Sequence, residues 1–296
     1  MKRQYITGIT GMVFGALTLF LFSCKKYEVK SLGPNPAASF TVTAISGQVN
    51  KYLLTSTSSN SYRYDWDKAT GTFMQGKMID TVYFPDAGTY TVKLRVFGQS
   101  GIDSASKQIV VAADDPAAIT PFKILTGNNT RRWKLAPEAG ALWIGPADFS
   151  QTWWQNSVAD VTTRSCHFND EYTFVKAGSV MQFDGKNDIW VDEEAGNPWP
   201  AGMPPVGCYA SNAIPAQFQP WSMSANFTFE VINNNKLKVI GLGAHLGLYK
   251  AATPPDAAVA TPQSSVTYDI VSLTPTRLVV KLDYGWGAWR FTYVSF

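Results

Sequence analysis

The chain has 296 residues, a length that suits two domains better than one. Its formal net charge is only +3, and Lys2 and Arg3 contribute part of that charge at the extreme amino terminus. A nearly neutral chain lacks the positive charge by which proteins bind nucleic acid, and 14% aromatic with 16% charged residues is unlike a disordered segment.

The amino-terminal segment is arranged like a bacterial export signal. Two basic residues lead into an apolar run that is shorter than a typical membrane-spanning helix. The tetrad Leu21-Phe22-Ser23-Cys24 then resembles the lipobox of bacterial lipoproteins. This resemblance implies a signal peptide over residues 1–23, a lipid on Cys24 and a tether over residues 24–36. It also implies attachment to the outer membrane, with the cell surface preferred over the periplasmic face. An uncleaved span and an ordinary secretory signal are the alternatives.

Two cysteines are left once Cys24 is assigned to lipid, namely Cys166 and Cys208. In an oxidising compartment such an even pair predicts a disulfide, which by the chain-entropy account would stabilise the fold by roughly 4 kcal/mol. Two separately buried thiols are the alternative. His167 and His245 lack the tight spacing that would make a zinc site with these cysteines.

Residues 37–112 are predicted to form a first domain of short β-strands. From Tyr90 to Val96, apolar and polar residues alternate strictly, which is the pattern of a strand with one buried face and one solvated face. Gly88 and Gly98 punctuate the ends of this stretch. Because no segment shows a convincing helical period, the domain is expected to be a small β-sandwich.

Two motifs in this domain resemble the PKD family, whose members are immunoglobulin-like sandwiches. They are Tyr64-Asp65-Trp66-Asp67 and Phe84-Pro85-Asp86-Ala87-Gly88-Thr89-Tyr90-Thr91-Val92-Lys93-Leu94. The family usually has Gly-Asp-Gly in the turn after the first motif, whereas this chain has Lys68-Ala69-Thr70-Gly71. The resemblance implies a spacer or adhesion module without catalytic residues.

Residues 113–118 read as a polar linker, and residues 119–296 as a larger domain that holds nine of the ten tryptophans. Alternating stretches separated by turn residues predict antiparallel hairpins near its carboxyl terminus. The expected architecture is an antiparallel jelly-roll sandwich, which makes the whole chain all-β. A lipocalin-like barrel is the alternative, because Leu125-Thr126-Gly127 followed by Arg132-Trp133-Lys134-Leu135 resembles the opening of lipocalin-like lipoproteins.

Five tryptophans lie in segments that read as loops, and they are Trp153, Trp154, Trp199, Trp221 and Trp286. An indole face stacks on the apolar face of a sugar ring while nearby polar groups bind its hydroxyls, so these are candidate glycan-binding residues. The amides interleaved with them are Gln151, Gln155, Asn156, Asn197, Asn212 and Gln219. The tryptophans assigned to strands and to the core are Trp133, Trp190 and Trp289.

Catalytic signatures are weak. Glycoside hydrolysis needs two carboxyl groups across the scissile bond, and in residues 192–194 neighbouring carboxylates would point to opposite faces of a strand. His167 and Glu171 would share one face of a strand, where an acid–base pair is the alternative to a solvated surface. No catalytic residue, metal ligand or cofactor is assigned, although residues 65–67 and 184–188 leave a structural calcium ion as an alternative.

The order of lipobox, PKD-like sandwich and Trp-rich β domain resembles PKD-bearing surface lipoproteins of bacterial polysaccharide-utilisation systems. In the second domain the resemblance rests on Trp133-Lys134-Leu135, Ile144-Gly145-Pro146, Trp153-Trp154 and Asp170-Glu171-Tyr172-Thr173-Phe174. It implies a membrane-anchored, non-enzymatic protein that captures a polysaccharide or oligosaccharide, with an outer-membrane transporter complex as a further partner. A glycoside hydrolase acting on a β-glucan-like polysaccharide and an adhesion lipoprotein without a sugar site are the alternatives.

Overall fold

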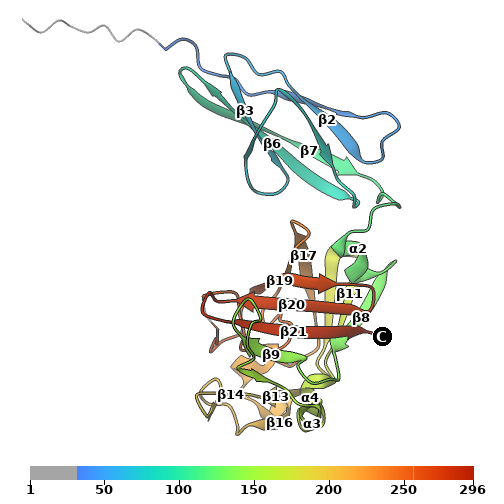
Figure 1. Cartoon of the computed structure of the whole chain (residues 1–296), viewed down its shortest axis with the longest axis vertical. Helices are drawn as coiled ribbons and strands as arrows, with labels where there is room; N and C mark the ends of the chain where they lie inside the picture. Colours follow the sequence, from blue (N-terminus) through green and yellow to red (C-terminus); the bar gives the residue numbers. More distant parts are fainter. Residues whose placement is uncertain (1–31, 256) are drawn as a thin grey trace, which may run out of the picture.

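The computed structural model describes residues 32–255 and 257–296, which form two β domains joined by a short segment (Figure 1). The expected signal peptide, Cys24 and the first part of the tether lie outside the described residues. Within the part that is described, no helix is long and apolar enough to cross a bilayer.

The first domain consists of two antiparallel sheets. Its strands are β1 (Phe40–Ala44), β2 (Lys51–Ser56), β3 (Arg63–Lys68), β4 (Met74–Gly76), β5 (Ile79–Tyr83), β6 (Gly88–Gly98) and β7 (Gly101–Val111). One sheet has the order β1-β2-β5 and the other the order β4-β3-β6-β7. This division of consecutive strands between two sheets is that of an immunoglobulin-like sandwich, so the predicted architecture of this domain is confirmed.

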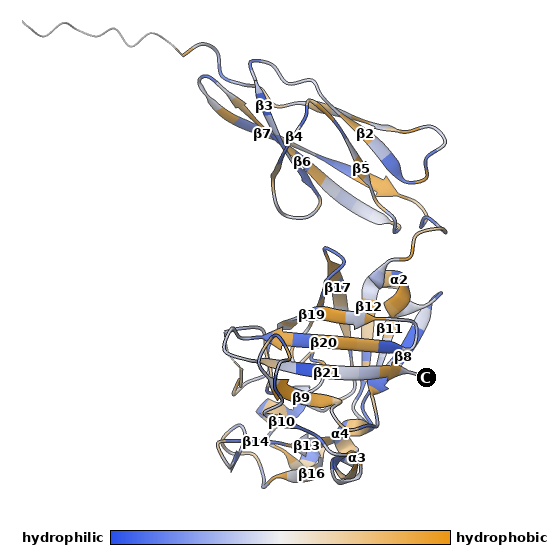
Figure 2. Ribbon diagram, in the orientation of Figure 1, coloured by the Kyte–Doolittle hydropathy of each residue, from blue (hydrophilic) through white to orange (hydrophobic). Residues whose placement is uncertain are grey.

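The core of the first domain follows the alternation in its sequence. Val92, Leu94 and Val96 on β6 are fully buried, and Trp66 on β3 packs edge-on against Phe40 with ring centroids 5.2 Å apart. Figure 2 shows polar and apolar residues mixed along the strands of both domains, as expected for strands with one buried face.

The second domain is built on eight strands that follow one another around a closed sheet. They are β8 (Thr130–Leu135), β11 (Glu171–Val175), β12 (Val180–Asp184), β17 (Ala225–Ile232), β18 (Lys236–Ile240), β19 (Ser265–Leu273), β20 (Arg277–Asp283) and β21 (Ala288–Ser295). Each strand pairs with the next in antiparallel fashion, and β21 returns to pair with β8, with Tyr293 opposite Leu135.

This closure corrects the expected jelly roll. A jelly roll needs connections that cross between two sheets, whereas here successive strands pair with each other and the last strand pairs with the first. The alternative, an up-and-down barrel, is therefore the observed architecture. Helix α2 (Pro121–Thr126) precedes the first barrel strand, and the indole N–H of Trp133 donates a hydrogen bond of 3.0 Å to the Leu125 carbonyl.

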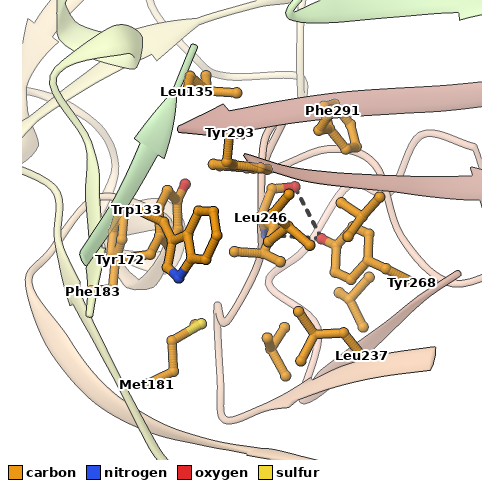
Figure 3. Packing of buried hydrophobic residues seen from close by; sticks show 14 of the residues in the cluster. Trp133, Leu135, Tyr172, Met181, Phe183, Leu237, Leu246, Tyr268, Phe291 and Tyr293 are labelled. Carbon is orange, nitrogen blue, oxygen red and sulfur yellow. Dashed lines mark hydrogen bonds between the residues drawn. The ribbon is translucent and has the colours of Figure 1, made fainter. Parts of the chain in front are cut away.

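The barrel interior is filled by side chains and by the loop of residues 241–252, which is the first part of the connection from β18 to β19. Figure 3 shows Leu246 of this loop between Tyr293 and Tyr268 in the middle of the core. The Leu246 N–H donates to the Tyr268 hydroxyl over 2.8 Å, and that hydroxyl donates back to the Leu246 carbonyl over 3.1 Å. A void beside His167 and His245 measures only about 10 Å³, roughly the room of one water molecule.

Two insertions close one end of the barrel (Figure 1). The first carries β9 (Leu142–Gly145), β10 (Trp154–Gln155), α3 (Val158–Thr163) and α4 (Ser165–Phe168), and the 3-10 turn η1 (Ala177–Ser179) follows β11. The second carries β13 (Asp188–Val191), β14 (Glu193–Glu194), β15 (Asn197–Pro198), β16 (Gly207–Ala210), η2 (Ser211–Ala213) and η3 (Ala216–Trp221). The predicted disulfide between Cys166 and Cys208 is present and ties the two insertions together.

The short helices depart from the expectation of a chain made of strands alone. Residues 165–168 form α4 rather than the start of a strand, and the strand expected there begins only at Glu171. Tyr172 and Phe174 point into the barrel as their alternation predicted. Phe168, the large apolar residue before the strand, is buried in the barrel core from a helix rather than from a strand, so tertiary packing overrides the two-residue period.

The segment of residues 113–118 is held at both ends by hydrogen bonds. The Asp114 carboxylate accepts from the Ala87 N–H over 2.8 Å in the first domain and pairs with the Lys176 ammonium of the barrel. The Asp115 N–H donates to the Pro85 carbonyl over 2.8 Å. The segment expected to be a simple linker therefore contacts both domains.

Candidate functional site

The five candidate tryptophans occupy three different environments. Trp153 and Trp286 are 48% and 57% exposed, and Trp154 is 37% exposed. Trp199 is half-buried and Trp221 is only 2% exposed. Large aromatic rings that remain this open are informative, because indoles are usually buried for most of their surface.

Trp153 and Trp286 lie next to each other with parallel rings. Their centroids are 6.1 Å apart and their planes differ by 5°. Tyr284 extends the row, with its ring 5.6 Å from that of Trp286 and inclined by 19°. We call these three rings, Tyr284, Trp286 and Trp153, the aromatic platform.

The platform is built by a tight turn and by the loop that faces it. The turn between β20 and β21 is closed by a 2.9 Å hydrogen bond from the Tyr284 N–H to the Gly287 carbonyl. Gly287 has no side chain, and a Cβ there would lie 2.6 Å from the Trp153 ring. The glycine therefore lets the turn and the ring of the opposing loop approach closely, which brings the two indoles together with parallel planes.

Trp154 belongs to a different surface from its neighbour in sequence. The register places Trp154 opposite Ile144 and Ile144 opposite Trp289, so these three side chains share the inward side of the sheet. The Trp154 ring meets Trp289 edge-on at 6.2 Å, and the Arg164 guanidinium lies 5.3 Å from its centroid. Because neighbouring residues on a strand point to opposite faces, Trp153 then faces outward.

Trp221 is not a surface residue, and its expected place in a binding surface is wrong. Its ring packs against Phe218 at 5.8 Å and against Tyr249 at 4.8 Å in the small core beneath the barrel. Trp199 is engaged as well, since its indole N–H donates a 2.8 Å hydrogen bond to the Val259 carbonyl. Proline-rich sequence around both residues suggested loops, but these loops fold over a core of their own.

The candidate amides separate in the same way. Gln151 and Gln155 are exposed in the segment that carries Trp153. Asn156 is fully buried and structural, because its side chain accepts from the Leu142 N–H and donates to the Glu138 and Ser157 carbonyls. The remaining three, Asn197, Asn212 and Gln219, lie in the second insertion.

Tyr284 is the member of the platform that sequence reasoning missed. Its position, between the end of an alternating strand and a Gly-Trp-Gly turn, carries a usable signal, since an aromatic residue there lies beside the exposed Trp286. The alternation of the preceding strand, with Val280 and Leu282 inward, predicts that Tyr284 is the last inward residue. In the structure its hydroxyl does reach inward and donates to the Ala252 carbonyl over 3.2 Å.

The residues considered for acid–base chemistry are not paired. His167 lies in α4 with its Nε2 atom 3.2 Å from the Gly247 carbonyl, and burial, assisted by the charge of Arg164, lowers its pKa to about 4. Glu171 instead pairs with Arg132 at 2.5 Å and Lys186 at 3.2 Å on the barrel exterior. The two side chains therefore do not form the pair that a common strand face would have allowed.

The carboxylates considered for calcium are also engaged with protein groups. Asp65 is bound by Arg63 and Arg95, each at 2.9 Å, and Asp184 pairs with Lys186 at 2.5 Å. Among the described residues, no three His, Cys, Asp or Glu side chains gather closely enough to hold a metal ion.

Comparisons with known proteins give distant similarities. No protein-family profile matches the chain, and no curated protein sequence matches it. The chain is similar to the PKD1 domain of Vibrio anguillarum Epp, with 21% identity over 27% of this chain and 96% of that chain, at a TM-score of 0.24. It is also similar to the PKD1 domain of the Vibrio cholerae metalloprotease PrtV, with 25% identity over 27% of this chain and 100% of that chain, at a TM-score of 0.24.

A third similarity covers both domains. A structure described as showing the promiscuous specificity of carbohydrate-binding modules from the β-sandwich superfamily is 12% identical over 88% of this chain and 92% of its own, at a TM-score of 0.24. With TM-scores this low, none of the three matches decides the fold or the function of the chain.

Proposed function

We propose that this chain is a glycan-binding protein and that the aromatic platform is its contact surface. The observation that carries the proposal is the parallel arrangement of two half-exposed indoles, Trp153 and Trp286, extended by Tyr284. Flat aromatic faces match the apolar C–H faces of sugar rings, and directed polar groups nearby fix the hydroxyls.

Exposed aromatic rings that bind no ligand lower the solubility of a protein, because they promote aggregation. Exposed apolar patches on soluble proteins mark interaction sites. This one lies on the turn between β20 and β21 and on the loop before β10, both of which are held by the strands of the barrel. The glycine at position 287 keeps the rings together, so the patch is a built feature of the turn.

In the proposed function the protein acts by capture, without catalysis. A lipid on Cys24 would hold it to the outer membrane, the first domain would space the barrel from the lipid, and a transporter complex would receive the glycan. A shallow, solvated platform binds weakly at one site, and many tethered copies raise the effective affinity without any new contact.

The binding proposal is tested by affinity electrophoresis of the purified protein through gels that contain laminarin, xylan, mannan or starch. Retardation in at least one gel is expected. Replacing an aromatic anchor of a binding surface typically weakens binding by about tenfold or more, so Trp286→Ala and Trp153→Ala should largely abolish that retardation. Trp154→Ala, on the inward side of the same segment, and Tyr62→Ala, on the first domain, are the matched controls and should migrate like the unmodified protein.

Retardation that persists in the Trp153→Ala and Trp286→Ala double variant would remove the platform from the proposal. Release of reducing sugar from the same glycans would contradict capture without catalysis.

The anchor is tested separately, by expressing the full chain with radiolabelled palmitate. Label should enter the unmodified protein and be lost in Cys24→Ala, and equal labelling of both would refute lipidation at this residue.

A further inference from the structure

We infer that the platform selects neutral glycans and discriminates against acidic ones such as polyuronates. The inference rests on the proposed function and adds the class of glycan. It comes from the charged residues on the two segments that carry the three rings, and these charges take no part in the stacking of the rings.

Few charged residues lie on the two segments that carry the platform. The segments that carry it, residues 142–153 and residues 281–290, together contain four charged side chains, Asp148, Lys281, Asp283 and Arg290. Two of these are cations and two are anions. Whether an acidic sugar is tolerated therefore depends on which of the four charges is free to meet it.

Both cations are already engaged by protein groups. The Lys281 ammonium lies 3.0 Å from the Asp283 carboxylate and donates to the Ala147 carbonyl over 3.3 Å. The Arg290 guanidinium lies over the Trp143 ring at 4.8 Å and over the Phe149 ring at 5.3 Å. Neither cation could turn toward a bound carboxylate without giving up these contacts.

One anion remains open to solvent. Asp148 is exposed in the loop before Trp153, and its carboxylate accepts a 3.0 Å hydrogen bond from the Ser150 N–H. Hydrogen bonds from Ser150 lower the pKa of this carboxyl, so it carries its charge at neutral pH. Among the described residues of the two segments that carry the platform, the charge without an ion-pair partner is therefore negative.

A uronate or sulfate group on this surface would meet the like charge of Asp148, while both cations of the two described segments are already engaged. The free energy lost when this anion gives up its water would not be offset, because only a partner charge or strong hydrogen-bond donors can compensate for the desolvation of an anion. The hydroxyls of a neutral sugar, in contrast, can donate to Asp148 and to the exposed amide oxygens of Gln151 and Gln155. The same contacts that favour neutral sugars thus disfavour acidic ones.

The test compares neutral and acidic glycans of matched backbone in affinity gels at low ionic strength. Hydroxyethyl cellulose is paired with carboxymethyl cellulose, and laminarin, mannan and starch are set against alginate and polygalacturonate. The neutral members should retard the protein, and the acidic members should do so at least about fivefold more weakly, the scale of one exposed charge–charge interaction.

Charge reversal at Asp148 identifies the residue responsible. Asp148→Lys should strengthen retardation by the acidic glycans by about fivefold or more, and it should weaken retardation by the neutral ones, because their hydroxyls lose the carboxylate that accepts from them. Glu230→Lys makes the same change at an exposed position on β17, four strands away from β21, and should change neither class.

The outcomes separate the two proposals. Equal retardation by neutral and acidic glycans, or stronger retardation by the acidic ones, overturns the inference and leaves glycan binding intact. An Asp148→Lys variant indistinguishable from Glu230→Lys also overturns it. Retardation by no member of either class overturns glycan binding, and the inference with it.

Discussion

Trp221 and Trp286 both lie in segments that the sequence predicts to be loops, yet one ring is buried and the other is exposed. Trp221 follows a proline-rich stretch and Trp286 lies in a glycine-rich turn, and both segments read as loops. The ring of Trp221 is enclosed by Phe218 and Tyr249, whereas that of Trp286 is more than half exposed. Their contributions to stability should differ as sharply as their burial.

Trp221→Ala should lower the free energy of unfolding by about 3–5 kcal/mol, because it leaves a cavity in a closed core. Trp286→Ala should change that free energy by no more than about 1 kcal/mol, since its ring faces solvent. Urea denaturation followed by circular dichroism measures both. Similar losses in the two variants would show that the burial described here is incorrect for one of them.

Asp170 should make the stability of the barrel depend on pH. It is buried beside Asp188, and burial, together with the charge of that neighbour, raises its pKa well above the ordinary value. The folded chain thus holds this proton more tightly than the unfolded chain does. The stability that the group contributes is fully present below about pH 4 and is lost as the pH rises through the raised value.

Asp170→Asn removes the group that must ionise, so it should flatten this decline and raise the melting temperature at pH 7–8 relative to the unmodified chain. Asp148→Asn is the control, because that carboxyl is exposed and its pKa is lowered by the hydrogen bonds of Ser150. Thermal unfolding between pH 4 and pH 8 decides the matter. An unmodified protein whose stability rises through this range, with Asp170→Asn following it, would contradict the assignment.

Among the elements, the loop of residues 241–252 departs furthest from the usual behaviour of a connection. Loops normally run over the surface because their backbone groups need partners. This one enters the barrel and finds partners inside, with Tyr268 accepting from and donating to Leu246. The loop takes the space that an open barrel would offer to a ligand, which directs the search for a site to the outside.

Tyr268→Phe should therefore destabilise the protein by about 2 kcal/mol or more, because it leaves the buried N–H and carbonyl of Leu246 without partners. Tyr62→Phe, at an exposed position, should be neutral within about 0.5 kcal/mol. Amide exchange at Leu246 should also accelerate in Tyr268→Phe. Unchanged exchange at this amide would show that the hydroxyl does not hold the loop.

On the scale of the whole molecule, polar contacts bind the segment between the domains to both of them. Asp114 contacts Ala87 of the first domain and Lys176 of the barrel, and the Thr120 hydroxyl donates to Asp86 over 3.0 Å. Domains joined by a small interface are expected to move relative to one another, and these polar contacts should limit that motion. A stiff joint would keep the platform at a fixed distance from the tether.

Lys176→Met removes the ion pair between Asp114 and the barrel while keeping the apolar stem of the side chain. The pair distance distribution from small-angle X-ray scattering should broaden, because more interdomain orientations become accessible. Lys186→Met is the matched control, since that lysine pairs with Asp184 and Glu171 within the barrel. Identical distributions for all three proteins would mean that the Asp114–Lys176 pair does not limit the motion.

The sequence by itself determined which residues face inward on most strands, because a two-residue period leaves a row of apolar side chains that must be buried. The inward residues Val92, Leu94 and Val96 on β6 follow this period, as do Tyr172 and Phe174 on β11. An even pair of cysteines likewise indicated the disulfide that the structure contains. Only the tertiary structure decided that β21 closes onto β8, that residues 241–252 fill the barrel, and that Trp221 is enclosed while Trp153 and Trp286 stand together outside. The reason is that local period reports which side of a strand is apolar, whereas closure and ring exposure depend on contacts between segments far apart in the chain.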